Sequence, residues 1–273
     1  MNTPTGRRIV RLGLLPLVAV ATACGSTTSP SPASSATAPR ASVAPATGAS
    51  PATTASPSIE PPPSAGPSGS ATPAFGSVID NPWFPLKPGT TLVYRGVKDG
   101  EKVVDTVQVT NGTKVIDGVT CVTVHDELTI AGVVEERTDD WYAQDVAGNV
   151  WYFGEDTAEL DSSGKVTSTE GTWASGTDGA TAGIFMPADP QIGDSHLQEF
   201  YAGHAEDHFV VLLTDTAIKV PAGSWDGALL TGEWTPLEPT VFSEKVYVRD
   251  IGEVREADVE GGDEHLELVS VKP

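Results

Sequence analysis

The stretch that decides the fold is Thr91-Leu-Val-Tyr-Arg-Gly-Val97, which is followed by the pair Asp99-Gly100 and the run Glu101–Thr110. Apolar and polar residues alternate along both runs, as they do in a strand that buries one face. An Asp-Gly pair between two such runs favours a tight hairpin, because both positions tolerate a positive φ. The stretch therefore predicts two antiparallel strands joined at Asp99-Gly100.

The same alternation continues to the C-terminus. Asn111-Gly112, Asp117-Gly118 and Ala131-Gly132 are further hairpin signals, and Asp145–Asn149 has the pattern of a type I turn with glycine in the left-handed position. Later strand candidates are Ser195–Tyr201, Glu206–Val220, Ala228–Trp234, Glu244–Val248, Glu253–Asp258 and His265–Val271. No long stretch has a period of 3.6 residues. We predict an all-β fold with a single antiparallel β domain, built as a barrel, a half-barrel or a sandwich, over residues 74–273.

The charge of the chain is strongly acidic and unevenly distributed. The 273 residues carry a formal net charge of −21. The first 73 contain four arginines and one glutamate, so the other 200 carry 12 of the 16 basic and 36 of the 37 acidic side chains, a net charge of −24. Nucleic-acid binding needs clustered Lys and Arg, and anionic lipid repels acidic proteins. We therefore expect no nucleic-acid partner, and no electrostatic adsorption of the domain to a membrane.

The N-terminal residues 1–23 have the pattern of a signal peptide. Arg7, Arg8 and Arg11 precede the apolar run Leu12–Val20, which is too short to span a bilayer. Ala21-Thr-Ala-Cys24-Gly25 then resembles the lipobox of bacterial lipoproteins, with Ala at the first position where Leu is more usual. That resemblance implies that Cys24 becomes the acylated N-terminus of a chain anchored on the extracytoplasmic face of the cell membrane. The alternative is a plain secretory signal cleaved just before Cys24, and either Sec or Tat export remains open.

Residues 24–73 have the composition of a linker. Ser, Thr, Ala, Pro and Gly dominate, so little apolar side chain is present to offset the entropy of ordering the chain. The sequence predicts a disordered tether that separates the domain from its lipid anchor.

Several motifs of the domain resemble an uncharacterised family of bacterial secreted and lipoprotein β domains. The motifs are Asn81-Pro-Trp-Phe-Pro-Leu-Lys-Pro-Gly-Thr-Thr91, Asp140–Asp145, Gly148–Asp156, Pro187-Ala-Asp-Pro190, Val220–Ser224 and Trp234–Glu238. The resemblance implies one compact β domain and carries over no catalytic residue.

An aromatic hairpin offers a candidate ligand site. The Asp145–Asn149 turn should pair Trp141-Tyr142 with Trp151-Tyr152-Phe153. We predict that Trp141, Tyr142, Trp151 and Tyr152 line a groove for an apolar or glycan ligand, in a binding or envelope-interaction module without enzymatic activity. The other possibility left open is a structural acidic surface protein with no small ligand.

The alternative enzyme hypothesis is a metal-dependent hydrolase that uses His196, His208 and Glu206. A turn near Ala202-Gly203 would place His196 opposite His208 with Glu206 nearby, and such a set can hold Zn²⁺ or Cu²⁺. A register slip of one residue would destroy this pairing.

The sequence contains only weak evidence for a calcium site or for a nucleophilic cysteine. The oxygen-rich residues around the aromatic hairpin are possible Ca²⁺ ligands without EF-hand spacing: Asp139, Asp140, Asp145, Asn149, Glu155, Asp156, Glu159 and Asp161. Cys121 lies in a strand pattern, where a buried inert thiol is the ordinary outcome. We therefore expect no resident cofactor, with Ca²⁺ or Zn²⁺/Cu²⁺ as the possible exceptions.

Overall fold

The computed structural model describes residues 74–76 and 78–273. The predicted signal peptide, Cys24 and the linker to residue 73 lie outside the described residues. The described part is all β, which confirms the predicted fold class, and it contains no helix. Among the residues that the structure describes, there is accordingly no helix long and apolar enough to cross a membrane.

The strands follow one another along the chain with short connections, mostly as antiparallel neighbours. In chain order they are β1 Phe75–Gly76, β2 Thr91–Lys98, β3 Glu101–Ile116, β4 Val119–Ile130, β5 Val133–Asp145, β6 Val150–Leu160, β7 Val166–Ser168, β8 Trp173–Ala174, β9 Thr181–Met186, β10 Ser195–Leu197, β11 Glu199–Phe200, β12 His208–Val220, β13 Gly223–Trp234, β14 Phe242–Val248, β15 Gly252–Glu260 and β16 His265–Lys272.

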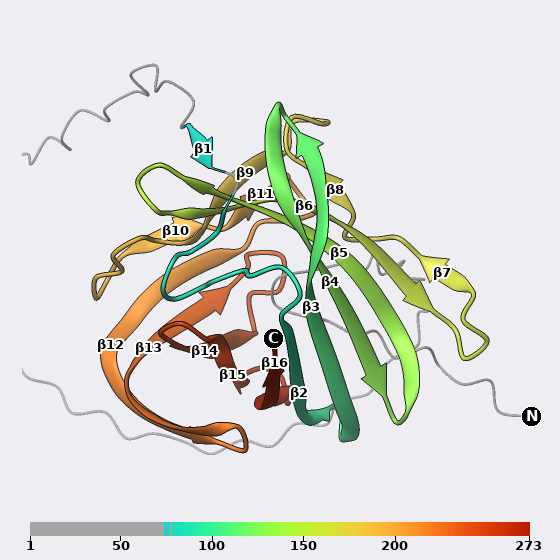
Figure 1. Cartoon of the computed structure of the whole chain (residues 1–273). Helices are drawn as coiled ribbons and strands as arrows, with labels where there is room; N and C mark the ends of the chain where they lie inside the picture. The colour runs from blue at the N-terminus through green and yellow to red at the C-terminus, as the bar shows by residue number, and fades with distance from the viewer. Residues whose placement is uncertain (1–73, 77) are drawn as a thin grey trace, which may run out of the picture. The chain divides into compact units, whose positions relative to one another are not determined.

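These strands form one nearly closed, barrel-like sheet. The order of neighbours is β10-β12-β13-β14-β15-β16-β2-β3-β4-β5-β6-β9-β11, and the short strands β1, β7 and β8 pair beside β5 and β6. β16 pairs with β2, so the two ends of the domain meet within the sheet. Figure 1 shows the long curved hairpin of β12 and β13 on one side and the strands β3–β6 on the other.

Closure of the sheet depends on the segment 195–200. Its first part, β10, pairs with β12, and its second part, β11, pairs with β9. Between them, the Gln198 backbone N–H donates to the Asp207 carbonyl at 2.8 Å. One short segment therefore joins the two ends of the strand order.

The core occupies the inside of this sheet in two clusters. Phe209, Leu229 and Tyr247 pack with Tyr142 and other residues of β3–β6. The second cluster includes Leu266 and Leu268 of β16 with apolar side chains of β2–β4 and β13–β15. A third, smaller cluster lies on the opposite face of β4–β6, where Cys121, Trp141 and Phe153 are packed under Phe75 of β1.

The turns confirm three of the four hairpin signals. Asp99-Gly100, Asp117-Gly118 and Ala131-Gly132 each have positive φ at both positions and each joins two consecutive strands. The prediction of a turn at Asn111-Gly112 is wrong, because β3 continues through this pair to Ile116. The pairing with β4 shifts register there, between Val109 and Thr113. The Thr110 hydroxyl accepts the Gly112 N–H at this irregularity, so the pair bends a strand and does not reverse it.

Gly183 of β9 is the position where closure leaves no room for a side chain. A Cβ there would lie 2.3 Å from the Leu197 carbonyl oxygen and 2.5 Å from the Gln198 carbonyl carbon. Both neighbours are backbone atoms and cannot rotate away. We predict that Gly183→Ala lowers the free energy of unfolding by roughly 1–3 kcal/mol, the usual cost of overpacking, in urea titrations.

Gly76→Ala is the matched control, because its Cβ would meet only the Gln144 carbonyl oxygen at 3.9 Å. Its effect should stay within roughly 0.5 kcal/mol. Equal effects of the two substitutions would contradict this account of closure.

Candidate functional site

A cavity of about 130 Å³ lies within the curved sheet. Carboxyl side chains dominate its polar lining, and Lys245 is the single basic side chain among the described residues that form it. The acids come from β3, β4, β5 and β15 and are Asp105, Asp126, Asp140, Glu253 and Glu256. The cavity is therefore an interior site with an excess of acidic groups.

Strand register explains why these acids point inward. Asp105 is opposite Tyr94, Asp126 is opposite Val107, and Asp140 is opposite Val124 in their antiparallel pairs. Directly opposed residues lie on the same face of a sheet. Since their partners belong to the core or line the cavity, the three aspartates share the inner face with them.

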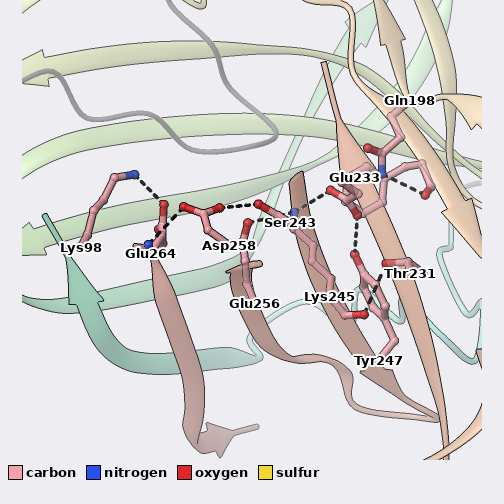
Figure 2. Close-up of polar contacts among 11 residues, drawn as sticks. Lys98, Gln198, Thr231, Glu233, Ser243, Lys245, Tyr247, Glu256, Asp258 and Glu264 are labelled. Carbon is pink, nitrogen blue, oxygen red and sulfur yellow. Dashed lines mark hydrogen bonds and ion pairs between the residues drawn. The ribbon is translucent and has the colours of Figure 1, made fainter. Parts of the chain in front are cut away.

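Lys245 of β14 holds one side of the cavity through ion pairs. Its Nζ lies 3.0 Å from Glu233 of β13 and 3.7 Å from Glu256 of β15, and the lysine is only 5% exposed. Burial alone would lower the pKa of Lys245, but the neighbouring charges of Glu233, Glu256 and Glu253 raise it well above its usual value. The lysine is therefore charged, and Figure 2 shows it between the two carboxylates.

A separate chain of polar contacts begins at Ser243, two residues before Lys245 on β14 (Figure 2). The Ser243 hydroxyl donates to Asp258, which also accepts the Glu264 backbone N–H at 3.1 Å. The Glu264 carboxylate binds Lys98 Nζ of β2 at 2.7 Å, with both side chains buried. The contacts connect β14, β15, the segment before β16 and β2 across their shared boundary.

A second polar group lies on β5 and β6, where Asp140 and Tyr152 line the cavity. The Tyr152 hydroxyl is 2.7 Å from Asp140 and 3.1 Å from Glu155. A hydroxyl has one hydrogen, so both contacts are hydrogen bonds only when one of the carboxyls carries a proton. Burial, followed by the charges of Glu199 and Asp140, raises the pKa of Glu155 well above its usual value.

Glu199 belongs to the same group of buried acids, and its carboxyl group makes no hydrogen bond to the described residues. The side chain is 1% exposed, and neither carboxylate oxygen has a hydrogen-bond partner among the described residues. Burial and the charge of Asp207 raise its pKa well above the usual value. The Trp173 indole N–H lowers that pKa, although the two groups lie outside hydrogen-bond geometry.

Aromatic rings form the apolar part of the cavity lining. Tyr142 and Tyr152 stack across the strands at 4.8 Å between ring centroids, as the paired aromatic hairpin predicted. Phe185 lies 5.1 Å from Tyr142 and Phe84 lies 4.6 Å from Phe185. All four rings line the cavity beside its acids.

Asn81 positions the segment that carries Phe84. Its side-chain oxygen accepts the Trp83 N–H at 2.8 Å, while its amide nitrogen donates to the carbonyls of Gly148 and Pro187. The buried amide thus ties the segment after β1 to the turn between β5 and β6. Phe84, Pro85 and Leu86 then reach the cavity from this anchored segment.

The predicted four-residue aromatic groove is wrong as a single surface. Tyr142 and Tyr152 belong to the inner core cluster, whereas Trp141 and Trp151 belong to the cluster on the other face of the sheet. Neighbours along a strand point to opposite faces, which separates each pair. Lys114 Nζ lies 3.3 Å above the Trp141 ring, and Trp151 donates its indole N–H to Asp145.

The predicted metal set His196, His208 and Glu206 is also not assembled. β10 pairs His196 with Phe209 and Leu197 with His208, so the register is one residue away from the expected pairing. The His208 ring stacks on Trp234 at 5.0 Å, and Glu206 accepts the Gly203 N–H in the turn. The described residues include no group of three or more His, Cys, Asp or Glu arranged for a metal ion.

The oxygen-rich residues proposed for Ca²⁺ are spread over separate environments. Asp145 caps its own turn by accepting hydrogen bonds from Asn149 and Trp151, and Asp139 pairs with His125 at 2.8 Å. Burial acts to raise the pKa of Asp145, but these hydrogen bonds and two backbone N–H groups together lower it. Asp140 and Glu155 lie in the interior, and Asp161 binds Ser163 in an exposed turn.

Cys121 is buried, as the strand pattern predicted. Burial raises the pKa of its thiol to about 12, and a weaker backbone hydrogen bond at Ile116 acts in the opposite direction. The thiol is therefore protonated at neutral pH and is a poor nucleophile.

Comparisons with known proteins are sparse. No family model matches the chain, and no curated protein matches it. One solved structure is similar, described as that of a "putative lipoprotein from Parabacteroides distasonis ATCC 8503", with 13% identity and a TM-score of 0.38. The match covers 70% of this chain and 98% of that one, and the likeness is too weak to support an inference about function.

The interior carboxyls make stability depend on pH, which gives a testable prediction. The native pKa values of Glu155 and Glu199 are raised, so the folded protein holds these protons more tightly than the unfolded chain, whose glutamates titrate near 4.5. The stability that protonation of Glu155 and Glu199 contributes is therefore fully present below about pH 4.5. It is lost as the pH rises through the raised pKa values that these two carboxyls have in the folded protein. We expect Glu199→Gln to reduce the fall in unfolding free energy between pH 5 and pH 8, as measured by urea titration.

Glu170→Gln is the control, because it makes the same change at an exposed position. Its stability profile should run parallel to that of the wild type. A Glu199→Gln profile that also runs parallel to the wild type would show that this carboxyl does not hold a shifted proton.

Proposed function

We propose that the chain is an exported, lipid-anchored protein whose β domain binds a small ligand inside the sheet and has no enzymatic activity. The observation that carries the proposal is the interior cavity, because it combines aromatic faces with charged groups on a rigid set of hydrogen-bonded strands. Ligand sites in proteins generally have this form, a concave apolar pocket with a few placed polar groups.

The anchor rests on Cys24 and on charge. The lipobox-like sequence Ala21–Gly25 supports acylation of Cys24, and two or three acyl chains give stable attachment where one does not. A domain with a net charge of −24 is repelled by anionic lipid, so retention at the membrane would depend on the lipid. The cell membrane is then a partner through the anchor alone.

The placement of the reactive residues supports binding over catalysis. His196 and His208 occupy different register positions, and each stacks on an aromatic ring, Phe209 and Trp234 respectively. The Cys121 thiol is buried and protonated. Polar groups converge instead on the cavity, and this placement supports the binding of a small molecule there.

The anchor is tested by Cys24→Ser. This substitution removes the thiol that would be acylated, so we expect the protein to move from the membrane fraction into the medium. Fractionation followed by immunoblotting measures the change, with Cys121→Ser as the matched control that should stay in the membrane fraction. Unchanged membrane retention of Cys24→Ser would refute the anchor.

The ligand is tested by filling the cavity. Native mass spectrometry of the full chain extracted in detergent should detect a bound molecule or bind one from a metabolite extract. Val107→Phe places a larger side chain in the cavity lining and should abolish the adduct, whereas Val115→Phe makes the same change at an exposed position of the same strand. A cavity that holds only water in all three proteins would favour a structural role without a ligand.

A further inference from the structure

We propose that the pairing of β11 with β9 is a pH-sensitive latch, which protonated Glu199 keeps closed and ionised Glu199 opens. The latch consists of two directly opposed pairs of residues, Glu199 with Ala182 and Phe200 with Thr181. It joins the segment 195–200 to the rest of the strand order, so its opening would separate the sheet along one boundary. The proposal concerns the closure of the sheet and does not depend on a ligand.

The latch is the shortest strand pairing in the order of neighbours around the described sheet. β11 has two residues, whereas β10 before it has three and β9 opposite it has six. Two apolar side chains of this segment, Leu197 and Phe200, are exposed and contribute little burial. Gln198 adds two hydrogen bonds, from its backbone N–H to the Asp207 carbonyl at 2.8 Å and from its side-chain amide to the Phe185 carbonyl at 3.5 Å. A segment with so few buried apolar contacts opens locally at a lower free-energy cost than the whole domain.

Glu199 places a carboxyl group in the interior at this weakly held boundary. The side chain is 1% exposed, and neither carboxyl oxygen has a hydrogen-bond partner among the described residues. A neutral carboxyl group can be buried at a modest cost, whereas burial of a carboxylate without a partner costs far more. The closed latch is therefore compatible with the protonated form of Glu199 and is strained by the ionised form.

The groups that face Glu199 increase this strain. The titratable side chains around it come from three elements, and none is basic: Asp207 before β12, Asp140 of β5, and Glu155 and Tyr152 of β6. Burial, followed by the charge of Asp207, raises the pKa of Glu199 well above its usual value. The Trp173 indole N–H of β8 acts in the opposite direction but lies outside hydrogen-bond geometry. Loss of the proton therefore adds a negative charge beside other acids, and no ion pair in the described part of the chain compensates it.

Proton linkage gives the direction of the switch. In the open latch the Glu199 carboxyl would reach water and titrate near its ordinary value of 4.5. Because the closed latch holds the proton more tightly, a rise in pH shifts the equilibrium toward the open form. One proton changes that equilibrium by at most about tenfold per pH unit, once the pH exceeds the pKa of the closed form.

Opening of the latch would also change the interior cavity. Phe185 of β9 and Gln198, next to β11, both line that cavity and are joined by a hydrogen bond. Separation of β11 from β9 would break this bond and divide the cavity wall between the two residues. A rise in pH would therefore expose the inside of the sheet at this boundary.

Hydrogen exchange tests the latch without a ligand. Mass spectrometry of the full chain in neutral detergent, between pH 6 and pH 9, gives protection factors that are corrected for the intrinsic pH dependence of exchange. We expect protection of the segments 181–186 and 195–201 to fall as the pH rises, by up to about tenfold per pH unit. Protection of the β14–β15 hairpin should stay constant, because it lies away from the latch in the strand order.

Two variants assign the effect to Glu199 and to the latch. Glu199→Gln stays neutral at every pH and should remove the fall in protection, whereas Glu170→Gln, at an exposed position, should behave as the wild type. Thr181→Cys/Phe200→Cys places two thiols at directly opposed positions, whose Cα separation in antiparallel strands is within the span of a disulfide. The oxidised double variant should show no fall in protection, and its reduction should restore the fall.

Three results would overturn the latch. Constant protection of 195–201 in the wild type would mean that ionised Glu199 is accommodated in the closed sheet, for instance by accepting the Trp173 indole N–H. A fall that persists in Glu199→Gln, or in the oxidised double variant, would assign the pH dependence to another group or another boundary. An equal fall in all strands would show global unfolding in place of a local opening.

Discussion

The ion pairs of Lys245 hold a charged group inside the sheet, and the polar wall of the cavity is built around them. They join β14 to its two neighbours, β13 through Glu233 and β15 through Glu256, on the inner face of the sheet. Removing two charges from water is costly, and the attraction between them offsets that cost only when the geometry is good. Here the lysine lies between carboxylates on both neighbouring strands, so its charge is kept (Figure 2). The interior can therefore hold ionised groups, which an ordinary barrel core would exclude.

Closure of the sheet turns these groups into a site. An open sheet would leave its acids in contact with solvent, where each would behave as a surface residue. The segment 195–200 joins β12 to β9, and the close approach of Gly183 to its backbone completes the enclosure. The result is a small cavity with aromatic faces, a lysine held by glutamates and an excess of carboxyls. The strong acidity of the domain thus has two locations, the surface and the interior.

The sequence predicted the strands well because their signals are local. Alternating residues and positive-φ turn pairs such as Asp117-Gly118 specify a hairpin without knowledge of the rest of the chain. The site was largely missed because it depends on distant pairings. A metal site at His196 and His208 requires a register that differs by one residue from that of β10 and β12. A groove that includes both Trp141 and Tyr142 requires neighbours along a strand to share a face, and the two rings lie on opposite faces. One signal was available: Asp105 alternates in phase with the apolar Val103 and Val107, so the pattern itself places a carboxyl among core positions.

The central claim is the proposal that a small ligand binds inside this sheet, against the aromatic rings that line its cavity. Isotope-filtered NMR tests it most directly, by recording nuclear Overhauser effects between the protons of the molecule that co-purifies with the chain and the side chains of the labelled protein. The account predicts cross-peaks to the ring protons of Tyr142 and Phe185, both of which line the cavity. Cross-peaks confined to rings outside the cavity lining, such as Trp234, or no cross-peaks at saturating ligand, would contradict it.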